Sequence, residues 1–356
     1  ELSASLRSAC ASLIDRLKAD SLVKAVTVAG NSVMEHLFLG ITPVSMAKIP
    51  YKPLFKEART VAAGEAGLGA VVDCPVYIFP MIGGFVGGDA VAAALALDLY
   101  EEKENTLLVD IGTNSEIILK ANGRLYATSA AAGPAFEAAG INRGMTAGTG
   151  AIRGVTVADG SMRLDVIGSV TARGICGSGL LDAVSVLLNE GVIDNSGRIL
   201  DAVEVSSSLS GRIKGNEQGN LFILSQGPKG AIAITQDDIR ALQVAKAAIR
   251  AGITTLMEKA DLQAGDIKKI HIAGAFGSNL SMRGLVDIGL IDTVWAGALN
   301  FAGDAALEGA ALALREDKKS EAEWLAKNTT YQPLSGSKVF ESEFLRHMDF
   351  PAGRKI

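Results

Sequence analysis

Two pairs of similar segments occur in the same order in the two halves of this 356-residue chain. KAVTVAGNSVMEHL at 24–37 resembles KKIHIAGAFGSNL at 268–280, and GGDAVAAALALDL at 87–99 resembles AGDAALEGAALAL at 302–314. The first pair has the pattern of a strand, a glycine turn and a helix, and the second has that of a glycine loop that opens a helix. Segments rich in Ala and Gly can resemble each other by chance, but the shared order favours an internal duplication. It predicts two related α/β subdomains.

A further segment, LLVDIGTNSEIILKANGRL at 107–125, precedes the second member of each pair, in the second half of the chain. Its apolar runs are separated by Gly-Thr-Asn and by Asn-Gly, which predicts a β-hairpin. The first half has no equivalent, and the chain opens on an amphipathic helix at 2–19. We therefore expect an incomplete first subdomain at 1–105, lacking its N-terminal hairpin, and a second subdomain at 106–356 with an insertion around 140–230.

Composition argues against several classes of protein. The chain is 48% hydrophobic, too apolar for a disordered protein, yet none of its apolar runs is long enough for a membrane helix. Its net charge is −5 and its basic residues are scattered, which argues against a nucleic-acid-binding surface. Three widely separated cysteines show neither metal-ligand spacing nor the even count of a disulfide framework. We expect a cytoplasmic protein without nucleic-acid or membrane partners.

The turn at 110–115 has the residues of a phosphate-binding loop. Asp110 ends an apolar strand, where its carboxylate could hold a water bound to Mg²⁺. Gly112 allows the backbone to approach phosphate oxygens, and the N–H groups and side chains of Thr113 and Asn114 can donate to them. The alternative is an ordinary hairpin turn, because Asp, Gly and Asn are common turn residues. The matching glycine loops elsewhere favour phosphate binding.

The strand at 268–273 is followed by Gly274, Ala275, Phe276 and Gly277. Small residues at such a turn let the flat face of a nucleoside lie against the backbone, although close packing of a helix on a strand also requires glycine. The helices that begin near 88 and 304 could pack on each other, with Asp89 and Asp304 as their caps. A hinge between two nucleotide-binding halves would use such a contact.

Two further loops, TSAAAGPAFEAAGINRGM at 128–145 and GICGSGLLDAV at 174–184, are rich in Gly and Ala. Ser129, Glu137 and Ser178 are polar groups in these apolar surroundings, and local hydrogen bonding in turns would also explain them. The three histidines lie in different predicted elements and pair with no cysteine or serine that the sequence reveals, so nucleophilic catalysis has little support.

Taken together, the motifs resemble those of a known family. DIGTNSE resembles the second phosphate loop, and IAGAFG the adenosine loop, of the acetate kinase/sugar kinase/Hsp70/actin fold. More narrowly, seven segments look like successive signatures of the reductive activators of corrinoid proteins: VAGNSVMEHLFLGITP, PMIGGFVGGDAVAA, LLVDIGTNSEIIL, SAAAGPAFEAAGI, GICGSGLLDAV, ITQDDIRALQVAKAAIRAGI and IAGAFG. The resemblance implies a duplicated, ribonuclease-H-like α/β fold.

The resemblance also implies an activity. Such activators use ATP, with Mg²⁺, to drive the one-electron reduction of a Co(II) corrinoid protein of a methyltransferase system to Co(I). Nucleotide would bind at Asp110, Gly112, Thr113, Asn114 and the loop of Gly274, Ala275, Phe276 and Gly277. Ser129, Gly133 and Glu137 would contact the corrinoid partner. A homodimer is expected.

This sequence departs from the family pattern in two ways. The four-cysteine spacing of a 2Fe–2S domain is missing, and so is the first phosphate hairpin. Both departures predict that this chain is a C-terminal piece of a longer protein. The piece alone would be inactive in electron transfer.

Three alternatives remain at this stage. A small-molecule kinase of the same fold would need a carboxylate base, for which Asp165, Asp182 and Glu137 are candidates. An activator of the 2-hydroxyacyl-CoA dehydratase type would need cysteines that share a 4Fe–4S cluster between subunits, and the three cysteines show no such pattern. A non-catalytic binding scaffold is the third.

Overall fold

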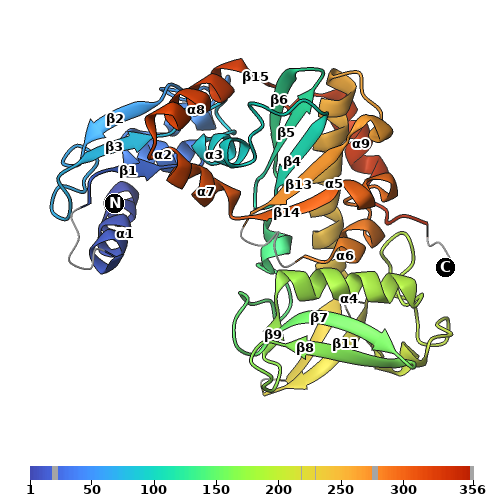
Figure 1. Ribbon diagram of the computed structural model, residues 1–356. Coiled ribbons are helices and arrows are strands. Elements are labelled where there is room, and N and C mark those ends of the chain that lie inside the picture. The colour runs from blue at the N-terminus through green and yellow to red at the C-terminus, as the bar shows by residue number, and fades with distance from the viewer. Residues whose placement is uncertain (18–22, 218, 229, 275–279, 353–356) are drawn as a thin grey trace. The chain divides into compact units, whose positions relative to one another are not determined.

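The computed structural model describes residues 1–17, 23–217, 219–228, 230–274 and 280–352 (Figure 1). The chain forms two compact units that each combine segments distant in sequence. Unit 1 comprises Glu1–Asp110, Ile118–Ser129 and Asp304–Pro333, and unit 2 comprises Ile111–Ile117, Ala130–Gly303 and Leu334–Ile356.

Helices and strands of unit 1 come from both ends of the sequence. Its helices include α1 (Leu2–Leu17), α2 (Ser32–Phe38), the 3₁₀ helix η1 (Val44–Ala47), α3 (Gly88–Ala96), α7 (Ala305–Leu312) and α8 (Glu316–Asn328). Its strands include β1 (Val26–Val28), β2 (Arg59–Ala62), β3 (Pro75–Ile78), β4 (Thr106–Asp110) and β15 (Thr329–Tyr331). Helix α8 and strand β15 lie in the polar segment that follows α7.

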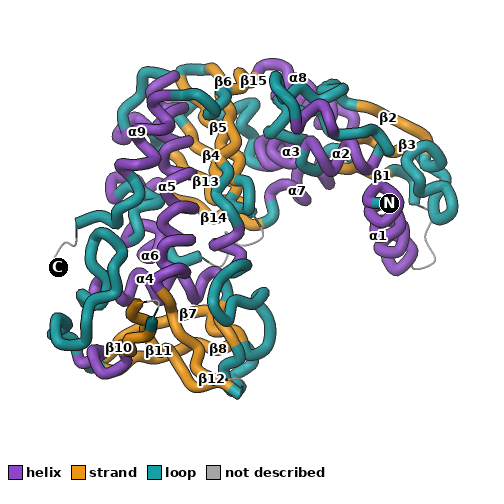
Figure 2. The backbone as a smooth tube through the Cα atoms, turned by 180° about the vertical axis from the view of Figure 1, so that it is seen from behind, coloured by secondary structure: helices purple, strands orange, loops and turns teal. Residues whose placement is uncertain are grey.

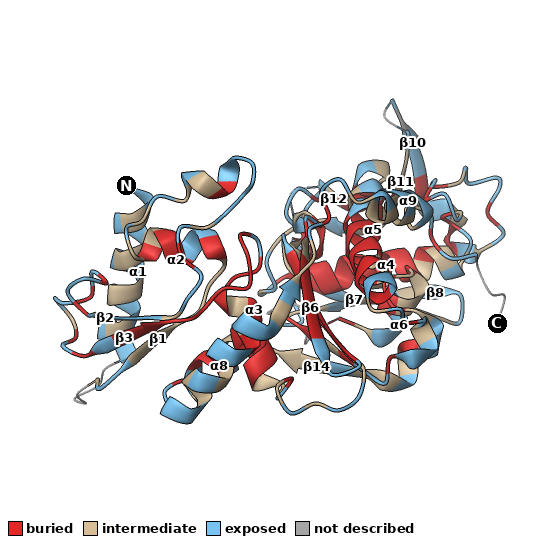
Figure 3. Cartoon of the chain, turned by 90° about the horizontal axis from the view of Figure 1, so that it is seen from above, coloured by how far each residue is buried: buried red, intermediate tan, exposed pale blue. Residues whose placement is uncertain are grey.

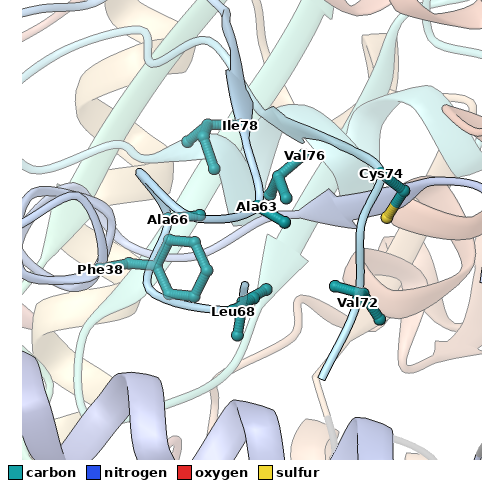
Figure 4. Packing of buried hydrophobic residues seen from close by; sticks show 8 residues of the cluster. All are labelled: Phe38, Ala63, Ala66, Leu68, Val72, Cys74, Val76 and Ile78. Atoms are coloured by element: carbon teal, nitrogen blue, oxygen red, sulfur yellow. The ribbon is translucent and has the colours of Figure 1, made fainter. Parts of the chain in front are cut away.

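A small sheet organises the first part of unit 1. Its strands have the order β1-β3-β2, with β1 parallel and β2 antiparallel to β3. Beside it, Phe38 of α2 packs against the buried side chains of Ala63, Ala66, Leu68, Val72, Cys74, Val76 and Ile78 (Figure 4). Leu6 and Ile14 of α1 pack on this cluster, and the Arg7 guanidinium donates from Nε to the carbonyl of Phe38 at 2.6 Å. The amphipathic first helix is therefore part of this core.

Helices α3 and α7 pack directly on each other in unit 1. A Cβ atom added at Gly309 of α7 would lie less than 3.0 Å from the backbone of Ala92 in α3. Thr27 of β1 also donates from Oγ1 to the carbonyl of Ala310 at 2.6 Å. The predicted contact between the two glycine- and alanine-rich helices is confirmed, and it depends on a position without a side chain.

Unit 2 holds the remaining elements. Its helices include η2 (Pro134–Glu137), α4 (Gly177–Asn189), η3 (Ser208–Arg212), α5 (Gln236–Lys259), η4 (Ala264–Asp266), α6 (Met282–Asp287), η6 (Thr293–Ala298) and α9 (Lys338–Arg346). Its strands include β7 (Ala151–Ala158), β8 (Ser161–Val166), β9 (Gly174–Ile175), β10 (Ile213–Asn216), β11 (Gly219–Gly227), β12 (Gly230–Thr235), β13 (Lys269–Ala273) and β14 (Leu299–Gly303). Strands β5 (Ser115–Ala121) and β6 (Arg124–Ala130) have residues in both units.

The largest sheet has six strands in the order β14-β13-β4-β5-β6-β15. Strands β13 and β14 are parallel, as are β6 and β15. The predicted insertion contains two three-stranded sheets, ordered β8-β7-β9 and β10-β11-β12 (Figure 2). Helix α4 packs on β7, where a Cβ at Gly179 would come within 3.0 Å of the backbone of Ile152.

Helix α5 is the long buried helix of unit 2 (Figure 3). Thr235 caps it, because its side chain accepts from the N–H of Asp238 while the Asp238 carboxylate accepts from the N–H of Thr235. A Cβ at Gly252 would lie 2.7 Å from the Ile117 side chain, so α5 approaches the large sheet closely. Within the described ranges, no helix is both long and apolar enough to cross a membrane.

A buried lysine joins α5 to the segment after α9. The Lys246 ammonium is fully buried and donates to the carbonyls of His347 and Asp349, at 2.6 Å each. Burial lowers the pKa of this group to about 8, so it remains charged at pH 7. Lys246→Met should lower the free energy of unfolding by about 2–4 kcal/mol, because two carbonyls lose their charged donor.

Urea denaturation followed by circular dichroism measures this loss, and limited proteolysis reports the release of α9. Lys259→Met at the exposed end of the same helix is the control and should change stability by less than about 0.5 kcal/mol. Equal stability of both variants would contradict an anchoring role for Lys246.

Candidate functional site

The predicted phosphate loop is a tight turn between β4 and β5. Leu107, Leu108 and Val109 are buried in β4, whereas Thr113 and Asn114 are exposed at the turn. The Ser115 hydroxyl closes the turn, accepting from the N–H of Gly112 at 3.4 Å and donating to its carbonyl at 3.2 Å. The loop therefore presents its two polar side chains outward, where a ligand can reach them.

Asp110 lies at the end of β4 beside other carboxylates of unit 1. Burial, together with the negative charges of Asp89 and Asp304, raises the pKa of Asp110 to about 7. The Asp89 carboxylate accepts from the N–H of Ala90 at 2.8 Å, and that of Asp304 accepts from the N–H of Leu307 at 3.2 Å. The charges of Asp89 and Asp304 thus oppose ionisation of Asp110, and a cation would be favourable there.

The caps predicted for α3 and α7 differ in outcome. Asp304 is the N-cap of α7, as predicted. For α3 the prediction was wrong, because Gly87 occupies the N-cap position and Asp89 stands inside the first turn. Added at Gly87, a Cβ would come within 3.0 Å of the backbone of Asn31 and Ser32, so no larger residue fits there. Glycine holds the cap position because two loops meet at it.

The donor set near Asp110 fits a hard divalent cation only with outside ligands. Carboxylate oxygens are suited to Mg²⁺, which keeps several waters and binds through one or two carboxylates together with substrate phosphates. Among the residues that the structure describes, no three His, Cys, Asp or Glu side chains are grouped closely enough to hold a metal ion themselves. A water-mediated Mg²⁺ at Asp110 therefore stays a prediction that depends on bound phosphate.

Only the beginning of the predicted adenosine loop is described. Gly274 follows β13 with φ of +99°, a conformation that favours glycine, and its N–H donates to the carbonyl of Gly303 at 3.0 Å. Ala275, Phe276 and Gly277 lie outside the described residues. Nucleoside binding at this loop stays a prediction.

The phosphate loop contacts the second predicted loop within unit 2. Thr113 donates from its hydroxyl to Glu137 Oε1 at 2.8 Å, and the N–H of Gly133 donates to the Thr113 carbonyl at 2.8 Å. Thr113 was predicted to bind nucleotide, whereas Gly133 and Glu137 were predicted to contact a partner. Ser129, the third predicted partner residue, is half-buried at the end of β6. Two hydrogen bonds therefore connect residues assigned to different ligands.

The short helix η2, which ends at Glu137, packs against the rest of unit 2. Added at Gly177, the first residue of α4, a Cβ would come within 3.0 Å of the Phe136 backbone. Ser178 donates from Oγ to the carbonyl of Arg153 at 2.9 Å, so its hydroxyl has a structural partner. A displacement at Glu137 would therefore shift the residues at the start of α4.

A family model described as the C-terminal domain of RACo, the ASKHA domain, matches residues 104–355. A second model, described as the RACo middle region, matches residues 1–102. The chain belongs to the RACo family. Membership confirms the predicted actin/Hsp70/sugar-kinase type of fold, because that fold is the ASKHA domain.

Two curated proteins and one solved structure are similar to most of this chain. The corrinoid activation enzyme RamQ of Eubacterium limosum is 34% identical over 330 residues, covering 90% of this chain and 55% of the relative. The Co(II) methylated amine-specific corrinoid protein reductase of Methanosarcina barkeri is 25% identical over 363 residues, covering 93% and 63%. A solved reductive activator for corrinoid, iron-sulfur protein aligns with a TM-score of 0.87 at 34% identity, covering 98% and 57%. The chain spans a little over half the length of these relatives.

Sequence reasoning missed two buried polar residues in this RACo-family chain. Glu35 accepts from the N–H of Gly30 at 3.1 Å through Oε1, while its buried Oε2 has no hydrogen-bond partner among the described residues. Burial raises the pKa of this carboxyl group well above its usual value. His36 is also fully buried in α2. Two adjacent polar residues in the apolar helix VMEHLF were the signal that could have identified them.

Proposed function

We propose that this chain is the nucleotide- and partner-binding part of an ATP-dependent reductive activator, which reduces a Co(II) corrinoid protein of a methyltransferase system to Co(I). The names of its RACo-family relatives support a corrinoid protein as partner. The reaction adds one electron to cobalt, and a 2Fe–2S domain of the whole protein would supply it. Residues 1–105 and 106–356 would be the two subdomains, in a cytoplasmic homodimer.

The hydrogen bond from Thr113 to Glu137 carries this proposal. Thr113 is exposed, so a phosphate oxygen can accept the hydrogen that its hydroxyl now gives to Glu137. Glu137 would then lose its donor, and the segment from Gly133 to Glu137 would favour another position. Because this segment is the proposed partner-binding surface, nucleotide would change partner affinity through a population shift.

Bound Mg²⁺, held through water by Asp110, would neutralise phosphate charge at this loop. The chain's own residues do the rest. Gly112 and Asn114 offer N–H groups to the phosphates, and the closed turn at Ser115 holds them in place. A bound cation would favour the ionised form of Asp110, because its positive charge lowers the pKa that burial raises.

Thr113→Val and Glu137→Gln should act in opposite directions on nucleotide binding. Thr113→Val should weaken MgATP binding about 10-fold, because a donor to phosphate is lost. Glu137→Gln should strengthen it a few-fold, because the competing acceptor and its negative charge are weakened. Both variants should reduce the effect of MgATP on binding of a Co(II) corrinoid protein. Calorimetric titration with MgATP measures the nucleotide affinity of each variant. Titration with the Co(II) corrinoid protein, with and without MgATP, measures the effect of nucleotide on partner binding.

Thr146→Val, at an exposed threonine outside both loops, is the control and should match the wild-type chain. If both loop variants bind MgATP as the wild type does, the coupling through Thr113 is refuted. If the wild-type chain binds no MgATP at all, the non-catalytic scaffold becomes the better description of this part of the protein.

The kinase alternative gains no support from its candidate bases. Asp165 forms an ion pair with Arg153 at 2.7 Å, Asp182 accepts from Ser281 at 2.5 Å, and Glu137 accepts from Thr113. A general base must be free to take a proton from the acceptor hydroxyl. We therefore keep reductive activation as the proposed function.

A further inference from the structure

An exposed apolar patch with a lysine rim lies in unit 1 and contains none of the residues assigned to nucleotide or to the partner. We define the lysine-rimmed patch as Ile49, Tyr51, Leu54 and Phe85 together with Lys48, Lys52 and Lys56. The apolar side chains are well exposed: 82% for Ile49, 57% for Leu54, 45% for Phe85 and 37% for Tyr51. The Tyr51 and Phe85 rings lie 5.6 Å apart between centroids, so the patch joins two segments of the chain.

Buried His36 fixes the main segment of this patch. Its Nδ1 donates to the Ser32 carbonyl at 2.7 Å, and its Nε2 accepts from the N–H of Leu54 at 3.1 Å. The imidazole also stacks on the Phe55 ring at 4.6 Å between centroids. Burial lowers the pKa of His36, which keeps the ring neutral and able to accept at Nε2.

The second segment is fixed by the same helix. Ser32 donates from Oγ to the carbonyl of Gly83 at 2.9 Å. A Cβ at Gly84 would come within 3.0 Å of the Tyr51 carbonyl, so the two segments lie backbone to backbone. A surface held in this way loses little conformational entropy when a partner binds.

The charge of the patch is opposite to that of the whole chain. Residues 48–59 contain four cationic side chains and one acidic side chain, whereas the chain carries a net charge of −5. An apolar centre with aromatic side chains and a charged rim is typical of a protein–protein interface. The rim complements an acidic surface and would speed association with it.

The neighbouring groove favours a protein over the other possible occupants. A cavity of about 460 Å³ adjoins Lys56 and is lined by both signs of charge, including Glu57, Glu323 and Lys327. The carboxylates would repel an anionic membrane but can pair with protein side chains. A second copy of this chain in a two-fold dimer would set lysine rim against lysine rim, which costs energy.

We propose that the lysine-rimmed patch docks the corrinoid protein through an acidic, apolar-centred surface of that protein. This inference rests on the proposed function and specifies where in unit 1 the partner is held. Its residues take no part in the Thr113–Glu137 hydrogen bond, so we expect it to supply affinity that does not depend on nucleotide.

Two double variants test the proposal. Ile49→Asp with Leu54→Asp changes the apolar centre, and Lys48→Glu with Lys52→Glu reverses the rim. Val203→Asp with Lys214→Glu, both exposed in unit 2, is the matched control. Corrinoid iron–sulfur protein and a methylamine corrinoid protein, each as Co(II), are the probes. Calorimetry at low and high salt gives the dissociation constant, and MgATP affinity reports correct folding.

The centre variant should weaken partner binding at least 30-fold, because buried apolar contacts dominate interfaces. The rim variant should weaken it about 10-fold at low salt and much less at 0.5 M salt. The control and all MgATP affinities should stay within about twofold of the wild type. Wild-type binding that all variants retain would overturn this inference and leave the proposed function intact.

Other results would overturn it differently. If the wild-type chain binds neither probe, the proposed function fails together with the inference. If the centre variant only converts a dimer to a monomer in light scattering, the occupant is a second copy. If it only loses binding to phosphatidylserine vesicles, the occupant is a membrane.

Discussion

Replacing Gly309 with alanine should unfold unit 1 at a lower denaturant concentration, with a loss of about 3 kcal/mol. The new Cβ would lie less than 3.0 Å from the Ala92 backbone, so α7 must move away from α3. Helix propensity alone predicts the opposite sign, since Gly to Ala inside a helix gains about 1 kcal/mol. The sign of the change therefore decides whether close packing or propensity dominates here.

Gly64→Ala is the matched control in unit 1, because outside its chain neighbours no heavy atom of the described residues lies within 4 Å of its added Cβ. Its stability should stay within about 0.5 kcal/mol of the wild type. A stabilised Gly309→Ala variant would refute the packing described for α3 and α7. Gly309→Ala should also weaken MgATP binding. Asp89 and Asp304 stand at the beginnings of α3 and α7, and their charges act on Asp110, so moving these helices changes the electrostatics at Asp110.

Local patterns in the sequence identified most elements near the candidate site. The paired repeats predicted the strand, turn and helix sequences that became β1 with α2, and the glycine-led helices α3 and α7. The Thr235–Asp238 capping box and the turn after Asp110 were also readable, because each depends on residues a few positions apart.

Contacts between distant segments were not readable. Thr113 and Glu137 are 24 positions apart and meet only because η2 packs on its neighbours in unit 2. His36 and Leu54 are likewise linked by a loop that has no periodic pattern. Asp89 was assigned as a cap from its neighbours alone, whereas crowding between two loops decided the position in favour of Gly87. Tertiary packing determined each of these features.

Asp110→Asn should abolish most MgATP binding and yet stabilise the ligand-free chain at pH 8. Burial, with the charges of Asp89 and Asp304, raises the pKa of Asp110 to about 7, whereas the usual value is 3.8. The folded chain therefore holds this proton more tightly than the unfolded chain does. Stability is lost as the pH rises from about 4 to 7, and at pH 8 the charged group costs up to about 4 kcal/mol.

The asparagine variant removes this cost, so it should be more stable than the wild type by about 2–4 kcal/mol at pH 8, and the difference should disappear as the pH falls toward 4. Asp98→Asn, at an exposed position of unit 1 that lies 3.9 Å from Lys318, is the control for replacing a surface carboxylate. Urea titrations at several pH values measure the stabilities, and calorimetry should show MgATP binding weakened about 100-fold.

A variant that binds MgATP normally would remove Asp110 from the proposed site. If the asparagine variant is less stable than the wild type at pH 8, the Asp110 carboxylate of the wild type is already paired in the folded chain. The two measurements are independent, because the stability test concerns the empty loop and the binding test concerns the filled one. Together they show whether the Asp110 carboxylate binds a cation at a cost in stability or only completes a turn.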